Sequence, residues 1–249
     1  MKRKGLLLLC AQFTLALTMV MSAPNSQAVL LVQCPGDDGS NGGVAGDAIV
    51  DRTDIDAQTG LDYSKVNCMH LAASDGYTKM GDGSDRYIFS FKEVTGTELN
   101  LIPAAGQLNA HLPASKAGGR TNAMDFKELK EGEQFFLTLS NVGMALRPDL
   151  PDAHTIHYHG FPEASTIYDG VPDVSISPNS MASFTYFYNL VEPGTYIYHC
   201  HFEASEHMQM GMIGNLWVNP KQNDCATDPA CDAVALGHTA GDKYVYNDG

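Results

Sequence analysis

The sequence predicts an all-β fold, a sandwich or barrel built from short strands. Apolar and polar residues alternate in several short segments, Gly- and Pro-rich connections separate these segments, and no long stretch shows helical periodicity. Regularly spaced short strands with turn signals between them are typical of β-sandwiches and barrels. With 249 residues, 44% of them hydrophobic, the chain can bury a substantial core.

The first predicted strand, residues 86–94, alternates aromatic side chains onto one face. The other predicted strands are residues 134–142, 183–190, 194–201 and 214–219. We therefore expect one β-domain over residues 86–221. Residues 29–85 are rich in Gly, Asp, Ser and Asn, and we expect them to form a mostly irregular N-terminal extension.

The N-terminus has the pattern of a secretory signal peptide. Three basic residues precede an apolar run over residues 6–21, and small residues then predict cleavage after Ala28. The run is short for a membrane span, which needs about 20 residues. We expect an exported protein, periplasmic or secreted, without a membrane span after cleavage. Residues 222–249 form a polar tail whose end reads like the start of a further domain.

The chain is acidic, with a formal net charge of −14 at pH 7. A surface of this sign repels nucleic acids and anionic lipids, so neither is an expected partner. Removal of the basic signal peptide makes the mature chain more acidic still.

Five cysteines follow the predicted cleavage point, so at most four of them can pair with one another. Disulfides are expected in an exported chain. Cys225 and Cys231 are close in sequence, which leaves Cys34 with Cys68, although two other pairings of these four are open. The odd cysteine, Cys200, is flanked by histidines.

Six of the nine histidines lie in two short segments, HTIHYHG at residues 154–160 and GTYIYHCHFEASEHMQMGM at residues 194–212. Side chains alternate across a strand, so His199 and His201 point to one side and Cys200 to the other. One metal ion cannot easily bind all three. The pattern predicts two metal centres placed back to back and joined through the backbone.

On the cysteine side the ligand types are those of a blue-copper electron-transfer site, which uses a thiolate, two imidazoles and a weak axial thioether. Cys200 supplies the thiolate and His207 one imidazole, and His154 can supply the other from a neighbouring strand. Met212 is the expected axial ligand, with Met210 as the alternative.

The other side offers only imidazoles, from His157, His159, His199 and His201. Beside a cysteine–copper site, copper is the expected metal here too. A structural zinc site is disfavoured because the chain has no pair of cysteines at C-x2-C spacing. A Cys–His nucleophile is a weaker alternative, because no third orienting group is evident.

The segments HTIHYHG, DGVP and PGTYIYHCH…H…GM resemble the multicopper oxidase family of cupredoxin-fold proteins, which includes laccases. The resemblance covers roughly residues 131–219. It implies a cupredoxin-like Greek-key sandwich and a laccase-like oxidase that passes electrons from a type 1 copper to a type 2/type 3 cluster, where dioxygen is reduced. The implied type 1 ligands are His154, Cys200, His207 and Met212.

The resemblance also assigns His157 to type 2 copper and His159, His199 and His201 to the type 3 pair. Asp169, in YDG, matches an acidic position that the family associates with proton supply. In the family a cluster takes eight histidines from two domains, whereas this chain offers four. We therefore expect a second copy or another domain to complete the cluster, with a small-molecule, metal-ion or protein electron donor.

The sequence departs from the family in two respects. The gap between Cys200 and His207 is two residues longer than in most laccases, and His70, His111 and His238 match no family motif. Two other functions stay open: a copper nitrite reductase-like enzyme, and a non-enzymatic periplasmic cupredoxin that carries electrons or binds copper. The surplus of histidines disfavours both.

Overall fold

The computed structural model describes residues 31–40, 42–96, 129–144, 146–224 and 245–246. The predicted signal peptide, Cys225, Cys231 and most of the C-terminal tail lie outside the described residues. In the described part of the chain, no helix has the length and apolar character that crossing a bilayer requires.

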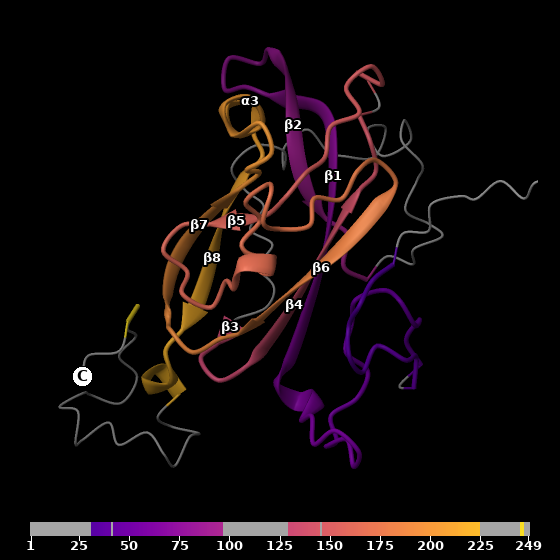
Figure 1. The fold of residues 1–249 in the computed structure, drawn as a ribbon, viewed down its shortest axis with the longest axis vertical. Helices are drawn as coiled ribbons and strands as arrows, with labels where there is room; N and C mark the ends of the chain where they lie inside the picture. Colours follow the sequence, from indigo (N-terminus) through magenta and orange to yellow (C-terminus); the bar gives the residue numbers. More distant parts are fainter. Residues whose placement is uncertain (1–30, 41, 97–128, 145, 225–244, 247–249) are drawn as a thin grey trace, which may run out of the picture.

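Within the described residues, eight strands form two four-stranded sheets, with the orders β2-β1-β4-β6 and β3-β8-β7-β5 (Figure 1). The strands are β1 (Val66–Lys79), β2 (Asp85–Glu93), β3 (Leu129–Lys130), β4 (Gln134–Asn141), β5 (His157–Tyr158), β6 (Ala182–Asn189), β7 (Gly194–His199) and β8 (Ile213–Asn219). The pairs β1–β4 and β3–β8 are parallel and the others antiparallel. The predicted all-β sandwich is confirmed.

The core lies between the sheets and is rich in aromatic rings. Phe89, Phe91, Phe135, Tyr186 and Tyr188 are all fully buried. They are inward-facing residues of strands predicted from alternation, and burying one such side chain stabilises the fold by roughly 1.5–3 kcal/mol. Each of these five rings contacts at least one other aromatic side chain.

The expectation that residues 29–85 are mostly irregular was wrong for β1. This strand lies inside its sheet between β2 and β4 and is buried along most of its length. A strand covered on both faces need not alternate, and this one is rich in Ala, Ser and Gly, so its sequence shows no period of two. The sheet therefore begins at Val66, upstream of the expected domain start.

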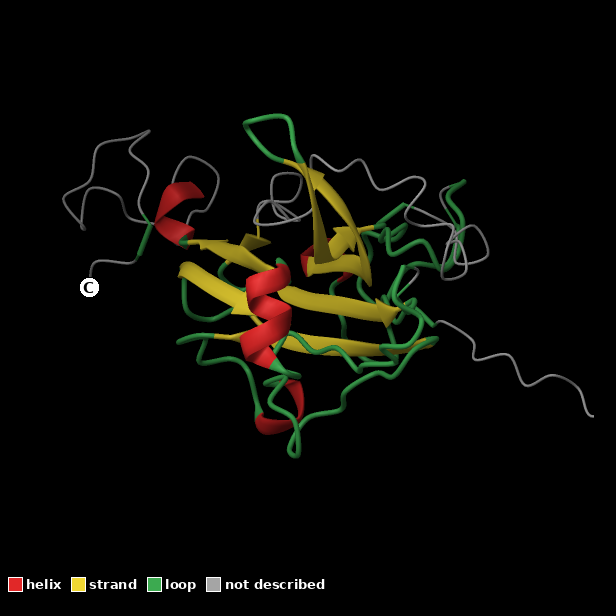
Figure 2. Ribbon diagram, turned by 90° about the horizontal axis from the view of Figure 1, so that it is seen from above, coloured by secondary structure: helices red, strands yellow, loops and turns green. Residues whose placement is uncertain are grey.

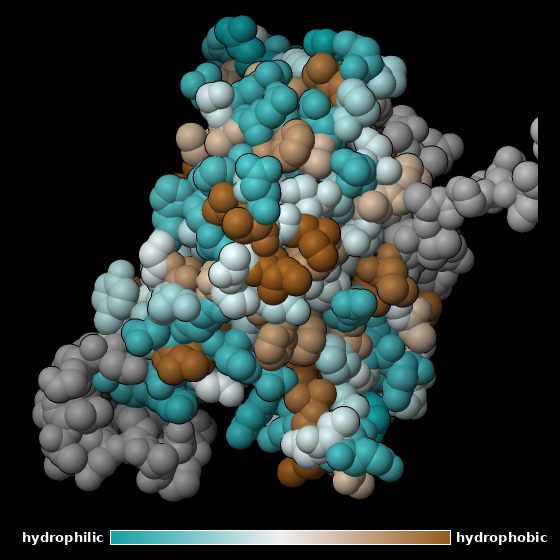
Figure 3. Space-filling model, in the orientation of Figure 1, coloured by the Kyte–Doolittle hydropathy of each residue, from teal (hydrophilic) through white to brown (hydrophobic). Residues whose placement is uncertain are grey.

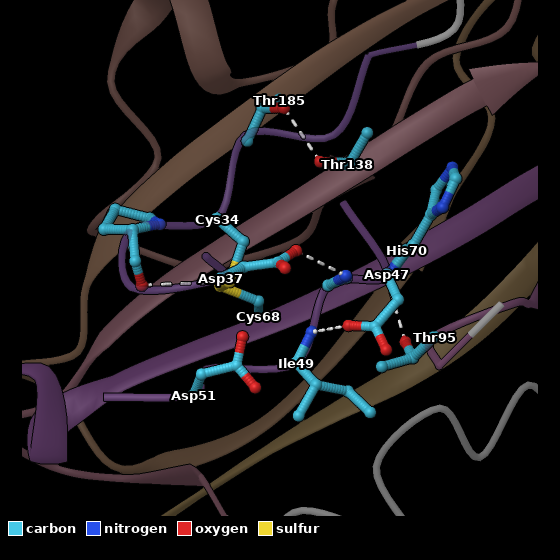
Figure 4. Close-up of a disulfide and its surroundings, with 12 residues drawn as sticks. Cys34, Asp37, Asp47, Ile49, Asp51, Cys68, His70, Thr95, Thr138 and Thr185 are labelled. Atoms are coloured by element: carbon cyan, nitrogen blue, oxygen red, sulfur yellow. Dashed lines mark hydrogen bonds between the residues drawn. A yellow bond between two sulfur atoms is a disulfide. The ribbon is translucent and has the colours of Figure 1, made fainter. Parts of the chain in front are cut away.

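The segment before β1 covers the outer face of that sheet and is attached by a disulfide. Cys34 and Cys68 are bonded, as predicted (Figure 4). The carboxylate of Asp37 accepts hydrogen bonds from the backbone N–H groups of Gly46 and Ala48. Hydrogen bonds to carboxylates, rather than regular secondary structure, thus order this loop.

Four short helical elements complete the described fold: η1 (Tyr63–Lys65), η4 (Thr166–Tyr168), α3 (Ala204–Met210) and η5 (Lys221–Asp224). The helix α3 lies at the end of the sandwich that also carries the β1–β2 turn, as the view down on that end shows (Figure 2). It packs against β2 and connects β7 to β8. The chain thus folds its second histidine segment back over the end of the core.

Candidate metal centres

Cys200, His154 and His207 converge at the end of the sandwich covered by α3. Cys200 directly follows β7, His154 precedes β5, and His207 lies on α3. The Sγ atom of Cys200 is 3.3 Å from Nδ1 of His207 and 3.8 Å from Nδ1 of His154. All three side chains are 0% exposed. Their donor atoms can therefore bind one ion in a site closed to water.

Backbone hydrogen bonds hold the methionine segment against this site. The N–H of Cys200 donates to the carbonyl of Met212 at 3.1 Å, and the N–H of Met212 donates to the carbonyl of His207 at 2.9 Å. Met212 is 0% exposed, whereas Met210 is only partly buried. Of the two candidate thioethers, Met212 is the one tied directly to two of the three converging residues.

Burial keeps these groups uncharged when no ion is bound. It raises the pKa of the Cys200 thiol to about 11 and lowers the pKa of His154 to about 3. Burial also lowers the pKa of His207. The imidazoles are therefore neutral ligands at pH 7, and a soft cation binds the sulfur by displacing its proton. This donor set fits copper.

Four histidines gather on the opposite side of the Cys200 backbone. His157 and His199 are directly paired across β5 and β7. The Nε2 atoms of His159 and His199 are 2.8 Å apart. The ring centroid of His201 lies 4.8 Å from that of His157 and 5.6 Å from that of His199. The structure thus brings all four predicted imidazoles together.

Two carbonyl groups orient these rings. Nδ1 of His157 lies 2.7 Å from the carbonyl oxygen of Asp169, and Nδ1 of His199 lies 2.8 Å from that of Cys200. A carbonyl only accepts, so each Nδ1 carries the hydrogen and each Nε2 presents its lone pair. Burial also lowers the pKa of His199, which keeps that ring neutral. Both rings can therefore bind a metal ion through Nε2.

Two of the four histidines, His157 and His159, line a pocket of about 520 Å³ together with Asp169. The Asp169 carboxylate lies 3.5 Å from Nδ1 of His157 and is partly exposed. The cluster side is thus open, while the cysteine side is closed.

Of the three histidines outside the two segments, the structure describes His70, which belongs to neither group. His70 is buried on β1, where Nε2 lies 2.7 Å from Oγ of Ser140. His111 and His238 lie outside the described residues. Sequence reasoning missed Asp152 and Glu203, whose carboxylates, together with His207, have ligand atoms within 4.8 Å of one another. Glu203 is four residues before His207, a spacing that would have indicated this proximity had the helix been predicted.

Comparison with known proteins agrees with the ligand pattern. Residues 132–223 match the family model described as multicopper oxidase. The multicopper oxidase MCE of Talaromyces pinophilus is 38% identical over 77 residues, which are 30% of this chain and 12% of that protein. The matched region is therefore a small part of that curated relative.

Solved structures of similar proteins include a blue copper oxidase from Nitrosomonas europaea, with 25% identity and a TM-score of 0.42. The match covers 62% of this chain and 39% of that one. A multicopper oxidase from Campylobacter jejuni has 21% identity and a TM-score of 0.40, over 64% of this chain and 27% of the other. In both cases the chain spans less than half of the relative.

Proposed function

We propose that this chain is a copper oxidoreductase of the multicopper oxidase family that reduces dioxygen with electrons from a separate donor. The match of residues 132–223 to that family model supports this proposal. One observation carries this proposal: the adjacent residues His199 and Cys200 belong to two different ligand groups. A covalent path of one peptide unit thus joins the two groups. Copper bound at both places would supply one-electron oxidation of the donor and reduction of dioxygen.

The closed site suits the type 1 copper. We assign His154, Cys200, His207 and Met212 as its ligands, with Met212 preferred to Met210 because it is buried and bonded to the ligand segments. These residues exclude water and keep the imidazoles neutral. Their fixed arrangement also limits reorganisation when the ion changes its charge.

The open histidine group suits part of a trinuclear cluster. We assign His157 to type 2 copper and His159, His199 and His201 to the type 3 pair. The carbonyls of Asp169 and Cys200 support this by directing Nε2 of His157 and His199 outward. We assign proton supply to the Asp169 carboxylate, which borders the pocket.

The cluster requires a partner, because the resemblance implies eight histidines and this chain brings four. The open pocket is consistent with a partner on that side. Exposed apolar residues flank Asp169 in the sequence, including Ile167, Val174 and Ile176. Hydrophobic side chains also gather in the middle of the face that carries β5 and β6 (Figure 3). We propose that a second copy or another domain covers this face and adds the missing imidazoles.

Export of the mature protein is part of the proposal. The Cys34–Cys68 disulfide supports it, since disulfides persist in oxidising compartments. Outside the cytoplasm, small molecules, metal ions and proteins are all available as electron donors.

The test is copper content and oxygen consumption measured across a size-exclusion profile of the purified chain. A dimer that closes the cluster should contain two type 1 ions and one shared cluster, and should consume oxygen. The monomer should bind one copper, show the blue absorption band and consume none. An electron carrier would show the same single copper in every fraction. A monomer that reduces oxygen with a full set of coppers would contradict the half-cluster assignment.

Two variants separate the sites. His157→Ala and His201→Ala should each abolish oxygen consumption and leave the blue band unchanged, because neither residue lies in the cysteine group. Loss of the blue band in both variants would show that the two groups do not form separate copper sites.

A further inference from the structure

Every proposed type 1 ligand is fully buried, so a donor in solution cannot touch the ligand set. An electron from such a donor must therefore pass through the side chains that separate His207 from solvent. Two groups of side chains offer a route between the surface and His207. One is the acidic rim formed by Asp152 and Glu203, where Oδ2 of Asp152 lies 3.9 Å from Nε2 of His207. The other is a row of aromatic rings, and this inference, which rests on the proposed function, concerns that row.

The aromatic row consists of Tyr77, Tyr87 and Phe89, and it ends on His207. The ring of Phe89 meets that of His207 edge-on, with centroids 5.4 Å apart. Tyr87 meets Phe89 at 5.7 Å, and Tyr77 meets Tyr87 at 5.8 Å across the β1–β2 pair. Tyr77 is 53% exposed. Continuous ring contacts therefore connect the surface to a copper ligand.

Tyr87 has a built-in proton acceptor. Its hydroxyl donates to Oδ2 of Asp75 at 2.7 Å, and Asp75 is 0% exposed. The backbone N–H groups of Leu146 and Arg147 also donate to this carboxylate. Oxidising a phenol that kept its proton would leave a cation in a partly buried place, which is costly. Transfer of the proton to Asp75 avoids that cost.

We propose that Tyr77 and Tyr87 relay electrons from a donor at the protein surface to the type 1 copper. With copper bound at the type 1 site, Tyr87 would give one electron to the oxidised ion, and its hydroxyl proton would move to Asp75. The phenoxyl then takes one electron from the donor through Tyr77 and recovers its proton from Asp75. The net change is one electron from donor to copper, with no proton gained or lost.

The surface at the Tyr77 end differs in charge from the acidic rim. Lys79, which is paired with Asp85, and the exposed Arg86 lie beside the cross-strand Tyr77–Tyr87 pair. With Asp82 in the adjoining turn, this end carries both signs of charge, whereas the rim is formed by carboxylates. A donor of negative charge is therefore better accommodated here than beside Asp152 and Glu203. A cationic donor should prefer the acidic rim. The two routes can thus be separated with outer-sphere donors of opposite charge.

The experiment measures bleaching of the blue band in the copper-loaded full chain after rapid mixing. Ferrocyanide is the anionic one-electron donor and hexaammineruthenium(II) is the cationic one. Tyr87→Phe keeps the ring contacts and removes the hydroxyl, while Tyr77→Ala removes the exposed ring. Tyr246→Phe is the matched control, because Tyr246 is 60% exposed and lies outside the row.

With ferrocyanide we expect both row variants to bleach about tenfold more slowly, the change that ~1.4 kcal/mol of added barrier makes. Hexaammineruthenium(II) and the Tyr246→Phe control should be unaffected. A solvent deuterium isotope effect on the ferrocyanide rate should disappear in Tyr87→Phe, which a purely structural role would not cause.

Two results would overturn the relay. Unchanged ferrocyanide rates in both row variants would mean that electrons enter across the acidic rim. Equal slowing with both donors would mean that Tyr87 only supports the copper site. If the unaltered chain formed no blue band, the proposed function itself would fail, and the relay with it.

Discussion

Replacing Gly170 by alanine should damage both copper sites, because this glycine packs against the segment that joins them. Its φ is +73°, and an added Cβ would lie 2.0 Å from the carbonyl oxygen of Ile156 and 2.9 Å from the nitrogen of His157. Ile156 stands between the ligands His154 and His157 in sequence. The backbone at Ile156 and His157 must therefore shift, and this shift would displace ligands of both groups.

The expected loss follows from two contributions. A non-glycine residue in the left-handed region costs roughly 1–2 kcal/mol, and the forced backbone shift adds strain on the order of 1–3 kcal/mol. Gly160→Ala is the matched control, since Gly160 has φ +66° and its added Cβ would meet nothing within 4 Å. The control should lose only about 1 kcal/mol.

Urea unfolding of the copper-free chain measures both losses, and the blue band of the copper-loaded protein reports the site. We expect Gly170→Ala to unfold at lower urea than Gly160→Ala, with a weakened blue band only in the former. Equal midpoints and equal bands in the two variants would refute the steric reasoning. Both variants would then lose stability only through the positive φ that Gly160 and Gly170 share.

Three further predictions concern single side chains. Cys200→Ser should abolish the intense thiolate-to-copper absorption, and persistence of the band would remove Cys200 from the site. Met212→Leu should raise the reduction potential by removing a weak donor, while Met210→Leu should change it little; potentiometry giving the reverse order would move the axial role to Met210. Burial lowers the pKa of His70 from 6.5 to about 4. As the pH falls, His70 therefore binds a proton in the unfolded copper-free chain before it does so in the folded chain. The free energy of unfolding should drop by up to ~3 kcal/mol between about pH 6.5 and 4. His70→Gln should flatten this part of the plot of unfolding free energy, measured with urea, against pH. An unchanged plot would show that His70 does not cause the drop.

The predicted strands were confirmed where one face is buried, because alternation is visible only there. Residues 86–94 and 183–190 correspond closely to β2 and β6. β1 was missed because neighbours on both sides and the covering segment bury it without any alternation. The helix α3 was missed as well, since seven residues are too few for a helical period to stand out.

The sequence by itself determined the residue types of the two ligand groups. The residue types in HTIHYHG and YHCHF, and the alternation of side chains along a strand, predict two ligand groups on opposite sides of Cys200 whatever the rest of the chain does. The Cys34–Cys68 pairing was open among alternatives, and the tertiary structure selected it.

Only the tertiary structure decided which groups approach from far away in the chain, and how deeply they are buried. His154 reaches Cys200 from 46 residues away because β5 pairs with β7. Met212, which follows the C-cap Gly211 of α3, is buried, whereas Met210 on the last turn of α3 is only partly buried. Asp152, Asp75 and Tyr87 have no local pattern, so the sequence cannot show their contacts. These contacts depend on long-range packing, whose distances no short segment encodes, while ligand type and alternation are local properties of the chain.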